Sequence, residues 1–411
     1  MHVFPMFLVI LLVFVNRYIF GLFMKLARGK NFDEAVEGNE PTVCVVTPMF
    51  NEGRRIERTI ATVAAFDYPR AKLEMVIVDD CSTDDSYEVA REVARGYPNI
   101  RVHRNAKNMG KRKSINAAVR ETRAEIIVSI DSDVEVDPSA LRHLLSRFTS
   151  PDVAAVGGRV HVSNANENWL TRMQAIKYFF GYEFLKNLER SLHTVMCLSG
   201  CLTAYRRSVL LELEPILENR NILGVPIKYG EDRFLTRQIV KAGYRTRLTL
   251  DAACFTVAPK TLSNYFSQQL RWRRSNIVDF MLGLSHAWRL HPFVCVHYVA
   301  LGTMLIAYPF VVLLELAAGS FFQLACFNLM IIAIIAVVYA LGSRSIPAAY
   351  RVHPVWFLSA AVVMPVTYVL FTPLALFTLD SSSWETRGQS ANAPTKPAEV
   401  TGEGVVGANA V

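Results

Sequence analysis

Charge is scarce in this sequence, and its cysteines lack the spacing of a metal finger. Only 19% of the 411 residues are charged, while 52% are hydrophobic and the mean hydropathy is +0.23. Such a chain is too long for one soluble domain and too apolar to be soluble throughout. We expect reduced thiols, without a zinc finger, at the seven cysteines, which lie at positions 44, 81, 197, 201, 254, 295 and 326.

The basic residues form no single stripe, although the net charge is +8. They gather beside apolar segments and beside polar turns. This distribution argues against a nucleic-acid partner, because nucleic-acid binding favours one continuous basic surface. It favours an anionic lipid surface or a phosphorylated substrate.

The apolar excess is concentrated in segments that are long enough to cross a bilayer. Four segments qualify, at 3–24, 293–316, 320–341 and 355–376. The first has no basic segment before it and no small-residue cleavage site, and it is longer than the apolar part of a usual signal peptide. We therefore predict an uncleaved membrane anchor at the N-terminus.

Basic residues near the span ends predict the orientation, because they favour the cytoplasmic side. Lys25, Arg28 and Lys30 follow the first span, and Arg344 and Arg351 lie between the third and fourth. We therefore expect the N-terminus outside, the segment 31–291 inside and the tail after 380 outside. The tail is rich in Ser, Gly, Ala, Pro and Asn, a composition typical of disorder.

Between the first two apolar spans, strand-like runs alternate with helical patterns. Strands are expected at 42–47, 75–78, 101–103 and 125–133, and helices at 54–66, 87–95 and 111–123. This alternation predicts an α/β fold with a mostly parallel sheet and helices on both faces. In such sheets ligands bind beyond the carboxyl ends of the strands, and the polar turns of this chain lie there.

Two aspartates end the last of these strands. Strand alternation puts Asp131 and Asp133 on the same side. Neighbouring carboxylates repel each other unless a cation lies between them, so a divalent metal ion is one interpretation. A solvated turn, or a helix cap ahead of Pro138, is the other.

Other polar residues at this edge also have simple structural explanations when each is considered alone. Asn51 and Asp84 could cap helices, and Lys111 could be a solvated helix residue. Capping rarely needs two adjacent aspartates at a strand end, as at Asp79 and Asp80. The joint placement therefore favours a binding site.

Seven motifs in a fixed order resemble those of a known family. They are Thr-Pro-Met-Phe-Asn-Glu at 47–52, Asp-Asp-Cys-Ser at 79–82, Asn-Met-Gly-Lys-Arg-Lys at 108–113, Asp-Ser-Asp at 131–133, Cys-Leu-Ser-Gly-Cys at 197–201, Gly-Glu-Asp-Arg-Phe-Leu-Thr at 230–236 and Gln-Gln-Leu-Arg-Trp at 268–272. Together they resemble the inverting family 2 glycosyltransferases, which have the A-type fold and use a nucleotide-diphospho-sugar donor. Within that family the chain looks most like the membrane-embedded processive synthases of hyaluronan, chitin oligosaccharides and cellulose.

The resemblance covers 42–275 and the order of the flanking spans, and it implies a division of the chain. The expected parts are an anchor at 1–30, a single cytoplasmic nucleotide-diphospho-sugar transferase domain at 31–260, amphipathic interface helices with the Gln-Gln-Leu-Arg-Trp motif at 261–292, three transmembrane helices at 293–379 and a disordered tail at 380–411. An amphipathic helix is also expected at 169–192.

For the donor, the resemblance implies a uridine site and a diphosphate site. Residues implied for uridine are Phe50, Glu52, Asp79 and Asp80. Many relatives have Tyr at the position of Phe50, so a hydroxyl contact is absent here. Residues implied for the diphosphate and ribose are Lys111, Asp131, Arg271 and Asp133. Asp133 would hold Mg2+ or Mn2+, and Asp131 would bind either the ribose or the same ion.

For catalysis, the resemblance implies that Asp232 is the general base. It would take the proton of an acceptor hydroxyl as that hydroxyl attacks the anomeric carbon opposite UDP, which inverts the configuration. Considered alone, Asp232 could instead cap a helix expected at 234–242.

For the acceptor, the resemblance implies a sugar platform on Trp272 with Gln268 and Gln269 beside it. Considered alone, a Trp next to Arg is also common at membrane interfaces. Cys197 and Ser199 would flank the acceptor. Many relatives have Ser-Gly-Pro where this chain has Ser-Gly-Cys at 199–201, and Cys197 could equally be a buried apolar residue.

The expected activity is membrane-bound, inverting, processive β-glycosyl transfer from a UDP-sugar to a growing chitin-like or hyaluronan-like polysaccharide, and the favoured donor is UDP-N-acetylglucosamine. The resemblance also implies a lipid bilayer as partner, location in the cell membrane and no nucleic acid; the oligomeric state stays open. Two alternatives are transfer to a lipid acceptor and, from another class, membrane transport. Charge is scarce in the spans and most polar motifs lie outside them, which argues against transport.

Overall fold

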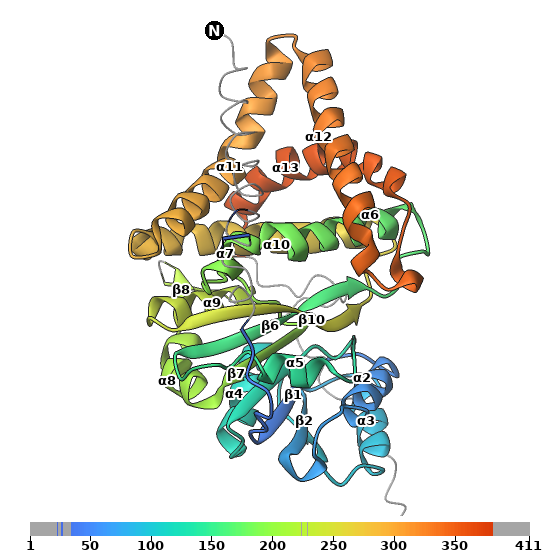
Figure 1. The fold of residues 1–411 in the computed structure, drawn as a ribbon, viewed down its shortest axis with the longest axis vertical. Coiled ribbons are helices and arrows are strands. Elements are labelled where there is room, and N and C mark those ends of the chain that lie inside the picture. Colours follow the sequence, from blue (N-terminus) through green and yellow to red (C-terminus); the bar gives the residue numbers. More distant parts are fainter. Residues whose placement is uncertain (1–22, 24–25, 28–33, 223, 228, 381–411) are drawn as a thin grey trace, which may run out of the picture.

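An eight-stranded sheet occupies the lower half of the molecule in Figure 1, and long helices occupy the upper half. The computed structural model describes residues 23, 26–27, 34–222, 224–227 and 229–380. Most of the expected N-terminal anchor and the tail after 380 therefore lie outside the described residues.

The central strands form because their residues are apolar at nearly every position. β1 (Val43–Met49) is buried at all seven residues, as expected for a strand covered on both faces. β1 pairs in parallel with β2 and β4, and β2 pairs in parallel with β3. The remaining strands of the large sheet are β2 (Leu73–Asp79), β3 (Ile100–Arg104), β4 (Ile126–Ile130), β5 (Val134–Val136), β6 (Val153–Val162), β7 (Leu202–Arg206) and β10 (Arg245–Thr256).

The strand order is β3-β2-β1-β4-β7-β6-β10-β5. β7 runs antiparallel to both β4 and β6, and β5 runs antiparallel to β10. The predicted α/β fold is confirmed, and these strands make the sheet mixed. A separate hairpin joins β8 (Asn221–Ile222) to β9 (Val225–Pro226).

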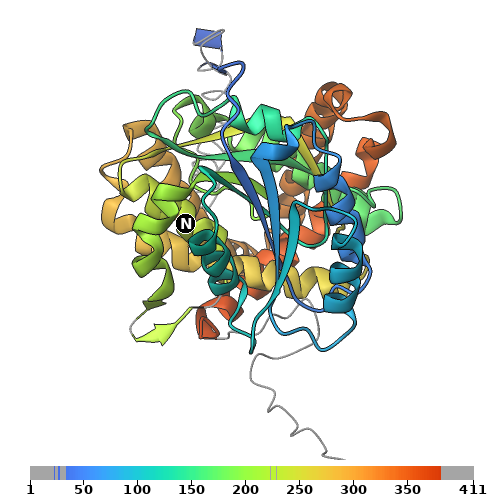
Figure 2. The same cartoon turned by 90° about the horizontal axis from the view of Figure 1, so that it is seen from below.

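Helices cover both sides of the strands, as Figure 2 shows for α4 on one side and α2 and α3 on the other. The helices of this layer are α2 (Arg55–Ala64), α3 (Ser86–Ala94), α4 (Lys111–Glu121), α5 (Ala140–Leu145), α8 (Arg207–Glu218) and α9 (Glu231–Lys241), with a short 3-10 helix at Arg70–Lys72. α9 begins three residues before the predicted 234–242, so its first turn contains Asp232.

Two helices lie between the sheet layer and the apolar helices (Figure 1). α10 (Leu262–Ala287) begins after Thr261, whose side chain accepts a hydrogen bond from the backbone of Asn264. α6 (Trp169–Phe180) begins with a capping box between Asn168 and Thr171. The expected single helix at 169–192 is interrupted, because a π-helical turn (Gly181–Leu185) separates α6 from α7 (Asn187–Ser191).

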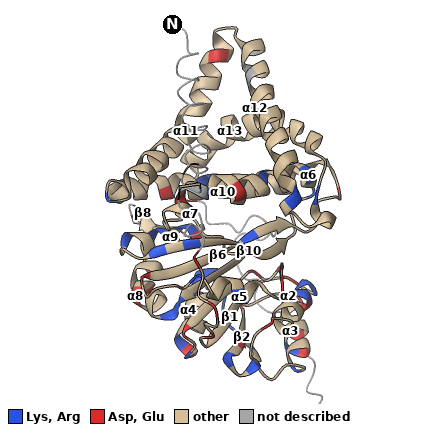
Figure 3. Ribbon diagram, viewed as in Figure 1, with Lys and Arg blue, Asp and Glu red and all other residues tan. Residues whose placement is uncertain are grey.

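Three helices in the described part of the chain are long and apolar enough to cross a membrane. They are α11 (Pro292–Ala317), α12 (Phe321–Gly342) and α13 (Ala360–Phe377), with 3-10 turns at Ser343–Ser345, Ala348–Tyr350 and Pro354–Ser359. Figure 3 shows almost no charge on them, Glu315 near the end of α11 being the exception. The three C-terminal apolar segments predicted from the sequence are thus confirmed as helices.

α13 lies crosswise below the hairpin of α11 and α12 (Figure 1). Ahead of it, Trp356 lies against Arg172 of α6, whose guanidinium carbon is 4.6 Å from the indole centroid. After it, the Thr378 hydroxyl accepts a hydrogen bond from Arg274 of α10 at 3.0 Å, and the Leu379 carbonyl accepts one from the Tyr229 hydroxyl at 2.8 Å. Both ends of α13 therefore lie against the layer that borders the sheet.

This arrangement bears on the membrane topology expected from the sequence. Three full crossings after residue 291 would put the chain beyond 380 on the side opposite the sheet. α13 instead leaves and returns on the sheet side, because α6 holds one end and α10 with Tyr229 holds the other. These contacts favour the sheet side for the chain after 380, and the expectation that it leaves α13 on the outside stays a prediction.

A reporter fusion tests the position of the end of α13 in a bilayer. Alkaline phosphatase, which is active only outside the cytoplasm, is fused after Asp380, after His291 and after Gly319. We expect the fusion at 380 to match that at 291, before α11, and to differ from that at 319, in the turn between α11 and α12. Agreement of 380 with 319 would instead mean that α13 crosses the membrane.

Candidate active site

The turns after β1 and β2 form one hydrogen-bonded unit. The Asn51 side chain, on a residue with φ of 54°, accepts a hydrogen bond from the Thr83 backbone at 2.9 Å. The Ser86 hydroxyl accepts bonds from the backbone N–H groups of Glu52 and Gly53 at 2.8 and 2.7 Å. The polar residues of these turns are therefore fixed by each other, and Asn51 is not the N-cap of α2, which is Arg54.

Phe50 and Glu52 are both buried in this unit. A Glu52 carboxylate oxygen accepts a hydrogen bond from the Ser132 hydroxyl at 2.6 Å. Ser132 lies between the two aspartates that follow β4. Glu52 therefore links the turn after β1 to the turn after β4, as the shared strand edge predicts.

Asp79 and Asp80 are almost completely buried and receive hydrogen bonds from this chain. Asp79 is 3.2 Å from Arg104 Nε and accepts from the Ser82 backbone at 3.3 Å. Burial raises the pKa of Asp79, against the opposing effects of the Ser82 hydrogen bonds and Arg104.

Asp80 fixes the loop that leads to α4. It accepts hydrogen bonds from the backbone of Met109 at 2.8 Å and Gly110 at 2.7 Å, and from the Asn105 amide at 2.8 Å. An aspartate that accepts three such bonds holds the N-terminus of α4, and with it Lys111, in place.

Lys111 joins three elements at the centre of the site. Its Nζ is 2.5 Å from an Asp131 oxygen and 3.4 Å from a Glu231 oxygen. Burial alone would lower the pKa of Lys111, but the carboxylates of Asp131 and Glu231 outweigh it, so the pKa is raised. Lys111 is therefore a fixed positive charge between α4, the end of β4 and α9, and not a solvated helix residue.

Asp232 lies beside this charge in the first turn of α9. One of its oxygens accepts a hydrogen bond from the Arg233 backbone at 2.8 Å, and the other is 3.4 Å from the Gly200 backbone nitrogen. A Cβ atom at Gly200 would lie 2.9 Å from Lys111 Nζ and 3.6 Å from both Asp131 oxygens. A side chain at this position would therefore require Lys111 Nζ to shift.

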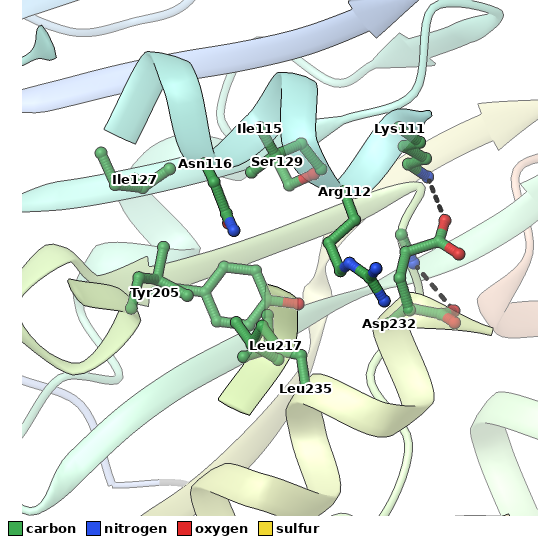
Figure 4. Close-up of a pocket in the computed structure, with 13 residues that line it drawn as sticks. Lys111, Arg112, Ile115, Asn116, Ile127, Ser129, Tyr205, Leu217, Asp232 and Leu235 are labelled. Atoms are coloured by element: carbon green, nitrogen blue, oxygen red, sulfur yellow. Dashed lines mark hydrogen bonds and ion pairs between the residues drawn. The ribbon is translucent and has the colours of Figure 1, made fainter. Parts of the chain in front are cut away.

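A pocket opens next to this group of residues. Figure 4 shows Lys111 and Asp232 at its rim, with Tyr205 and Asn116 on its walls. The pocket is lined by Lys111, Arg112, Ile115, Asn116, Ile127, Ser129, Gly200, Tyr205, Leu210, Leu217, Glu231, Asp232 and Leu235. Carboxylates and cations therefore meet an apolar wall at the position where a base would act.

The two aspartates after β4 face the same thiol. Burial raises the pKa of Cys201, and the negative charges of Asp131 and Asp133 raise it further. Carboxylate oxygens of this kind suit Mg2+ or Mn2+. The described residues contain no group of three or more His, Cys, Asp or Glu side chains that could hold a metal.

Arg271 reaches the same region from α10 by way of Tyr178 of α6. Burial raises the pKa of Tyr178, Cys201 and Asp133 add to the effect, and Arg271 opposes it. Arg271 Nε is buried without a hydrogen-bond partner among the described residues.

The residues expected to bind the acceptor lie on both sides of this region. Trp272 is half-buried, and its ring centroid is 6.3 Å from that of Tyr178. Gln269 accepts a hydrogen bond from Lys177 Nζ at 2.6 Å, and its own nitrogen lies 3.5 Å from a Gln268 oxygen. Trp272, which lies on α10, therefore packs against Tyr178 of α6.

Cys197 and Ser199 are half-buried beside Asp232. Burial raises the pKa of Cys197, Arg233 opposes this, and Asp232 adds to it. The Ser199 hydroxyl accepts a hydrogen bond from the Cys201 backbone at 3.2 Å. The turn that contains Cys201 in place of proline is thus held by Ser199.

Sequence reasoning missed four residues of the site: Glu231, Tyr205, Lys177 and Tyr178. A signal for Glu231 was present, because it directly precedes Asp232 in the motif at 230–236. Lys177 and Tyr178 gave none, since their neighbours on α10 are about 90 residues away along the chain.

Comparison with known proteins agrees with the geometry. A model of the family described as glycosyl transferase family 2 matches residues 44–214. The N-acetylglucosaminyltransferase of Mesorhizobium japonicum is 32% identical over 86% of this chain and 83% of that relative. That of Sinorhizobium fredii is also 32% identical, over 87% of this chain and 86% of that relative. That of Rhizobium leguminosarum bv. viciae is 33% identical over 86% of this chain and 84% of the relative.

A solved structure has a similar fold. It is the mannosyltransferase PcManGT from Pyrobaculum calidifontis in complex with GDP-Man and Mn2+, which is 22% identical, with a TM-score of 0.57 over 87% of this chain and 97% of that chain. At this identity the likeness concerns the fold alone.

Gly230, directly before α9, provides a test of how Asp232 is positioned. It has a φ of +64°, and an added Cβ would overlap the Ser275 side chain of α10. We expect Gly230→Ala to displace the start of α9 and to lower activity by more than about tenfold, because the strain of a positive φ, about 1–2 kcal/mol, is joined by an overlap of about 1–3 kcal/mol.

The matched control is Gly243→Ala, at a φ of +92° with no atom near its added Cβ. It shares the strain of the positive φ and lacks the overlap. Its thermal unfolding temperature should therefore fall less than that of Gly230→Ala, and its activity should stay close to normal. Equal loss in the two variants would mean that α10 does not position α9.

Proposed function

Because this chain belongs to glycosyl transferase family 2, we propose that it is a membrane-bound, inverting, processive β-glycosyltransferase. Its donor is UDP-N-acetylglucosamine and its acceptor is the end of a growing oligosaccharide of the chitin type. The observation that carries the proposal is 30–33% identity to several N-acetylglucosaminyltransferases over more than four fifths of this chain.

The names of these relatives favour a chitin-like product over hyaluronan, the other product considered from the sequence. Hyaluronan contains two alternating sugars and needs two donors, whereas each of the named relatives transfers N-acetylglucosamine by name. A membrane transporter without enzymatic activity does not fit a family 2 glycosyltransferase. Transfer to a lipid acceptor shares the donor site, but it leaves no role for a sugar platform at Trp272.

Uridine would bind at the turn that contains Phe50 and Glu52. A buried aromatic ring can lie against the base, and a carboxylate can accept hydrogen bonds from the base or the ribose. Asp79 and Asp80 would lie at the edge of this site. The ion pair of Asp79 with Arg104, and the hydrogen bonds that Asp80 accepts from the backbone before α4, support a role in holding its walls in addition to contact with uridine.

Lys111, Arg271, Asp131 and Asp133 would surround the diphosphate. A bound Mg2+ or Mn2+, held by Asp133 and by Asp131 where Asp131 does not serve the ribose, would neutralise the diphosphate and make UDP a better leaving group. Arg271 has a donor available for a phosphate oxygen. Lys111 forms ion pairs with Asp131 and Glu231. When the donor binds, the diphosphate would replace part of these ion pairs.

Asp232 would act as the general base. It would accept the proton of the acceptor hydroxyl while that oxygen forms a bond to the anomeric carbon and the bond to UDP breaks on the opposite face. One displacement needs one base and no nucleophile of the enzyme, so the α-linked donor would give a β-linked product. The hydrogen bond from the Arg233 backbone and the nearby Gly200 nitrogen would fix the orientation of the Asp232 carboxylate.

The acceptor's terminal sugar would lie on Trp272, with Gln268, Gln269, Cys197 and Ser199 around it. Retention of the product end on this platform would support repeated addition. The sheet layer would face the cytoplasm, where UDP-sugars are made, behind an N-terminal anchor. The division into a transferase domain at 31–260, interface helices at 261–292 and membrane helices at 293–379 belongs to the same proposal.

Donor dependence tests this proposal most simply. Purified full-length protein is given UDP-N-acetylglucosamine alone, UDP-glucuronate alone or both, with Mg2+ or Mn2+, and released UDP and product length are measured. We expect UDP release and a ladder of oligomers from UDP-N-acetylglucosamine alone. Dependence on both donors would indicate a hyaluronan-type product, and no release with UDP-N-acetylglucosamine would overturn the proposal.

A further inference from the structure

Lys177 of α6 is a lysine without an ion pair to any described residue, and it lies in the acceptor region. Its Nζ is 2.6 Å from the Gln269 side-chain oxygen and 3.5 Å from the Tyr265 hydroxyl. It also lies 5.6 Å from the centroid of the Tyr265 ring and 5.9 Å from that of Trp272. One amine therefore touches three residues of α10, and none of these contacts belongs to the transfer step described above.

The contact with Lys177 fixes which way the Gln269 amide points. A protonated lysine only donates hydrogen bonds, so the amide must present its oxygen to it. The Gln269 nitrogen then points away from α6, and its only partner among the described residues is a Gln268 oxygen at the long distance of 3.5 Å. The amide N–H group is thus left to donate to a ligand.

The same amine lies next to the sugar platform. Gln269 and Trp272 are three positions apart on α10 and therefore share one face of the helix. Lys177 and the adjacent Tyr178 both contact that face, Tyr178 through the Trp272 ring at 6.3 Å. α6 consequently holds both expected acceptor contacts in one arrangement.

We propose that Lys177 is a positioning residue for the acceptor: it orients the Gln269 amide so that its N–H group donates to an oxygen of the terminal sugar lying on Trp272. This inference rests on the proposed function, because it assumes a sugar acceptor at Trp272. It assigns no role to Lys177 in donor binding or in proton transfer.

The charge of Lys177 gives the proposal a second readout. Burial, with a smaller effect of Arg273 on α10, lowers the pKa of Lys177 to about 7. The other polar groups that face the amine are the Tyr265 hydroxyl and the Gln269 amide. Below pH 7 the charged amine holds the Gln269 oxygen more tightly than the neutral amine does above it, because charge-assisted hydrogen bonds are stronger.

The test measures KM for a chitin oligosaccharide acceptor and for UDP-N-acetylglucosamine in the full-length protein. We expect Lys177→Met to raise the acceptor KM by about tenfold, the worth of one hydrogen bond to a charged group, with the donor KM unchanged within about twofold. Arg172→Met is the control, since Arg172 lies on the same helix but contacts Trp356; it should change neither KM.

Gln269→Glu separates orientation from packing. It keeps an oxygen for Lys177 and removes the N–H donors, so we expect thermal stability close to normal with an acceptor KM raised at least as much as in Lys177→Met. In the unaltered protein the acceptor KM should rise as the pH increases through 7, and this rise should be absent in Lys177→Met. If Lys177→Met does not fold, the role of Lys177 is still tested by two quantities: the pH dependence of the acceptor KM in the unaltered protein and the acceptor KM of Gln269→Glu.

The outcomes separate this inference from the proposed function. If the unaltered protein does not extend the oligosaccharide at all, the proposed function fails. If it does, then a normal acceptor KM in Lys177→Met or Gln269→Glu, equal increases in donor and acceptor KM, or a pH dependence that persists in Lys177→Met would overturn the role of Lys177 alone.

Discussion

The site depends on one buried cation that neutralises carboxylates from separate elements. Asp131 ends β4, and Glu231 and Asp232 begin α9, so the fold brings negative charges together that would repel one another. Lys111 lies between Asp131 and Glu231, and Asp80 holds the loop that carries it. The Lys111 ion pairs therefore explain why the motifs at 79–82, 108–113, 131–133 and 230–236 occur together.

The helical layer is continuous with this charged centre. Gly230 contacts Ser275 of α10, and Arg237 of α9 forms a 2.8 Å ion pair with Asp279 of α10. α10 in turn contacts α6 through Gln269 and α13 through Arg274. A shift of α10 would therefore move the start of α9, so the residues proposed for the donor, the base and the acceptor are held by one packed unit and not by separate modules.

Sequence patterns predicted the elements that have local signals. The strands at β1, β2 and β4 are continuous apolar runs, and the three apolar helices follow from length and composition. The end of α6 at Phe180, the early start of α9 and the return of α13 to the sheet side depend on contacts between distant segments, such as Tyr229 with Leu379. For the same reason the sequence indicated Gln269 and Trp272 but gave no sign of Lys177, which contacts both.

The central claim is that Asp232 takes the acceptor's proton while other residues bind the donor, and Asp232→Asn tests it most directly. The measurement pairs sugar transfer with UDP binding by calorimetry, and Asp67→Asn, at an exposed aspartate far along the chain, serves as the matched control. The account predicts at least about a thousandfold loss of transfer with UDP affinity within about twofold of normal. Retained transfer, or loss of UDP binding together with transfer, would contradict it.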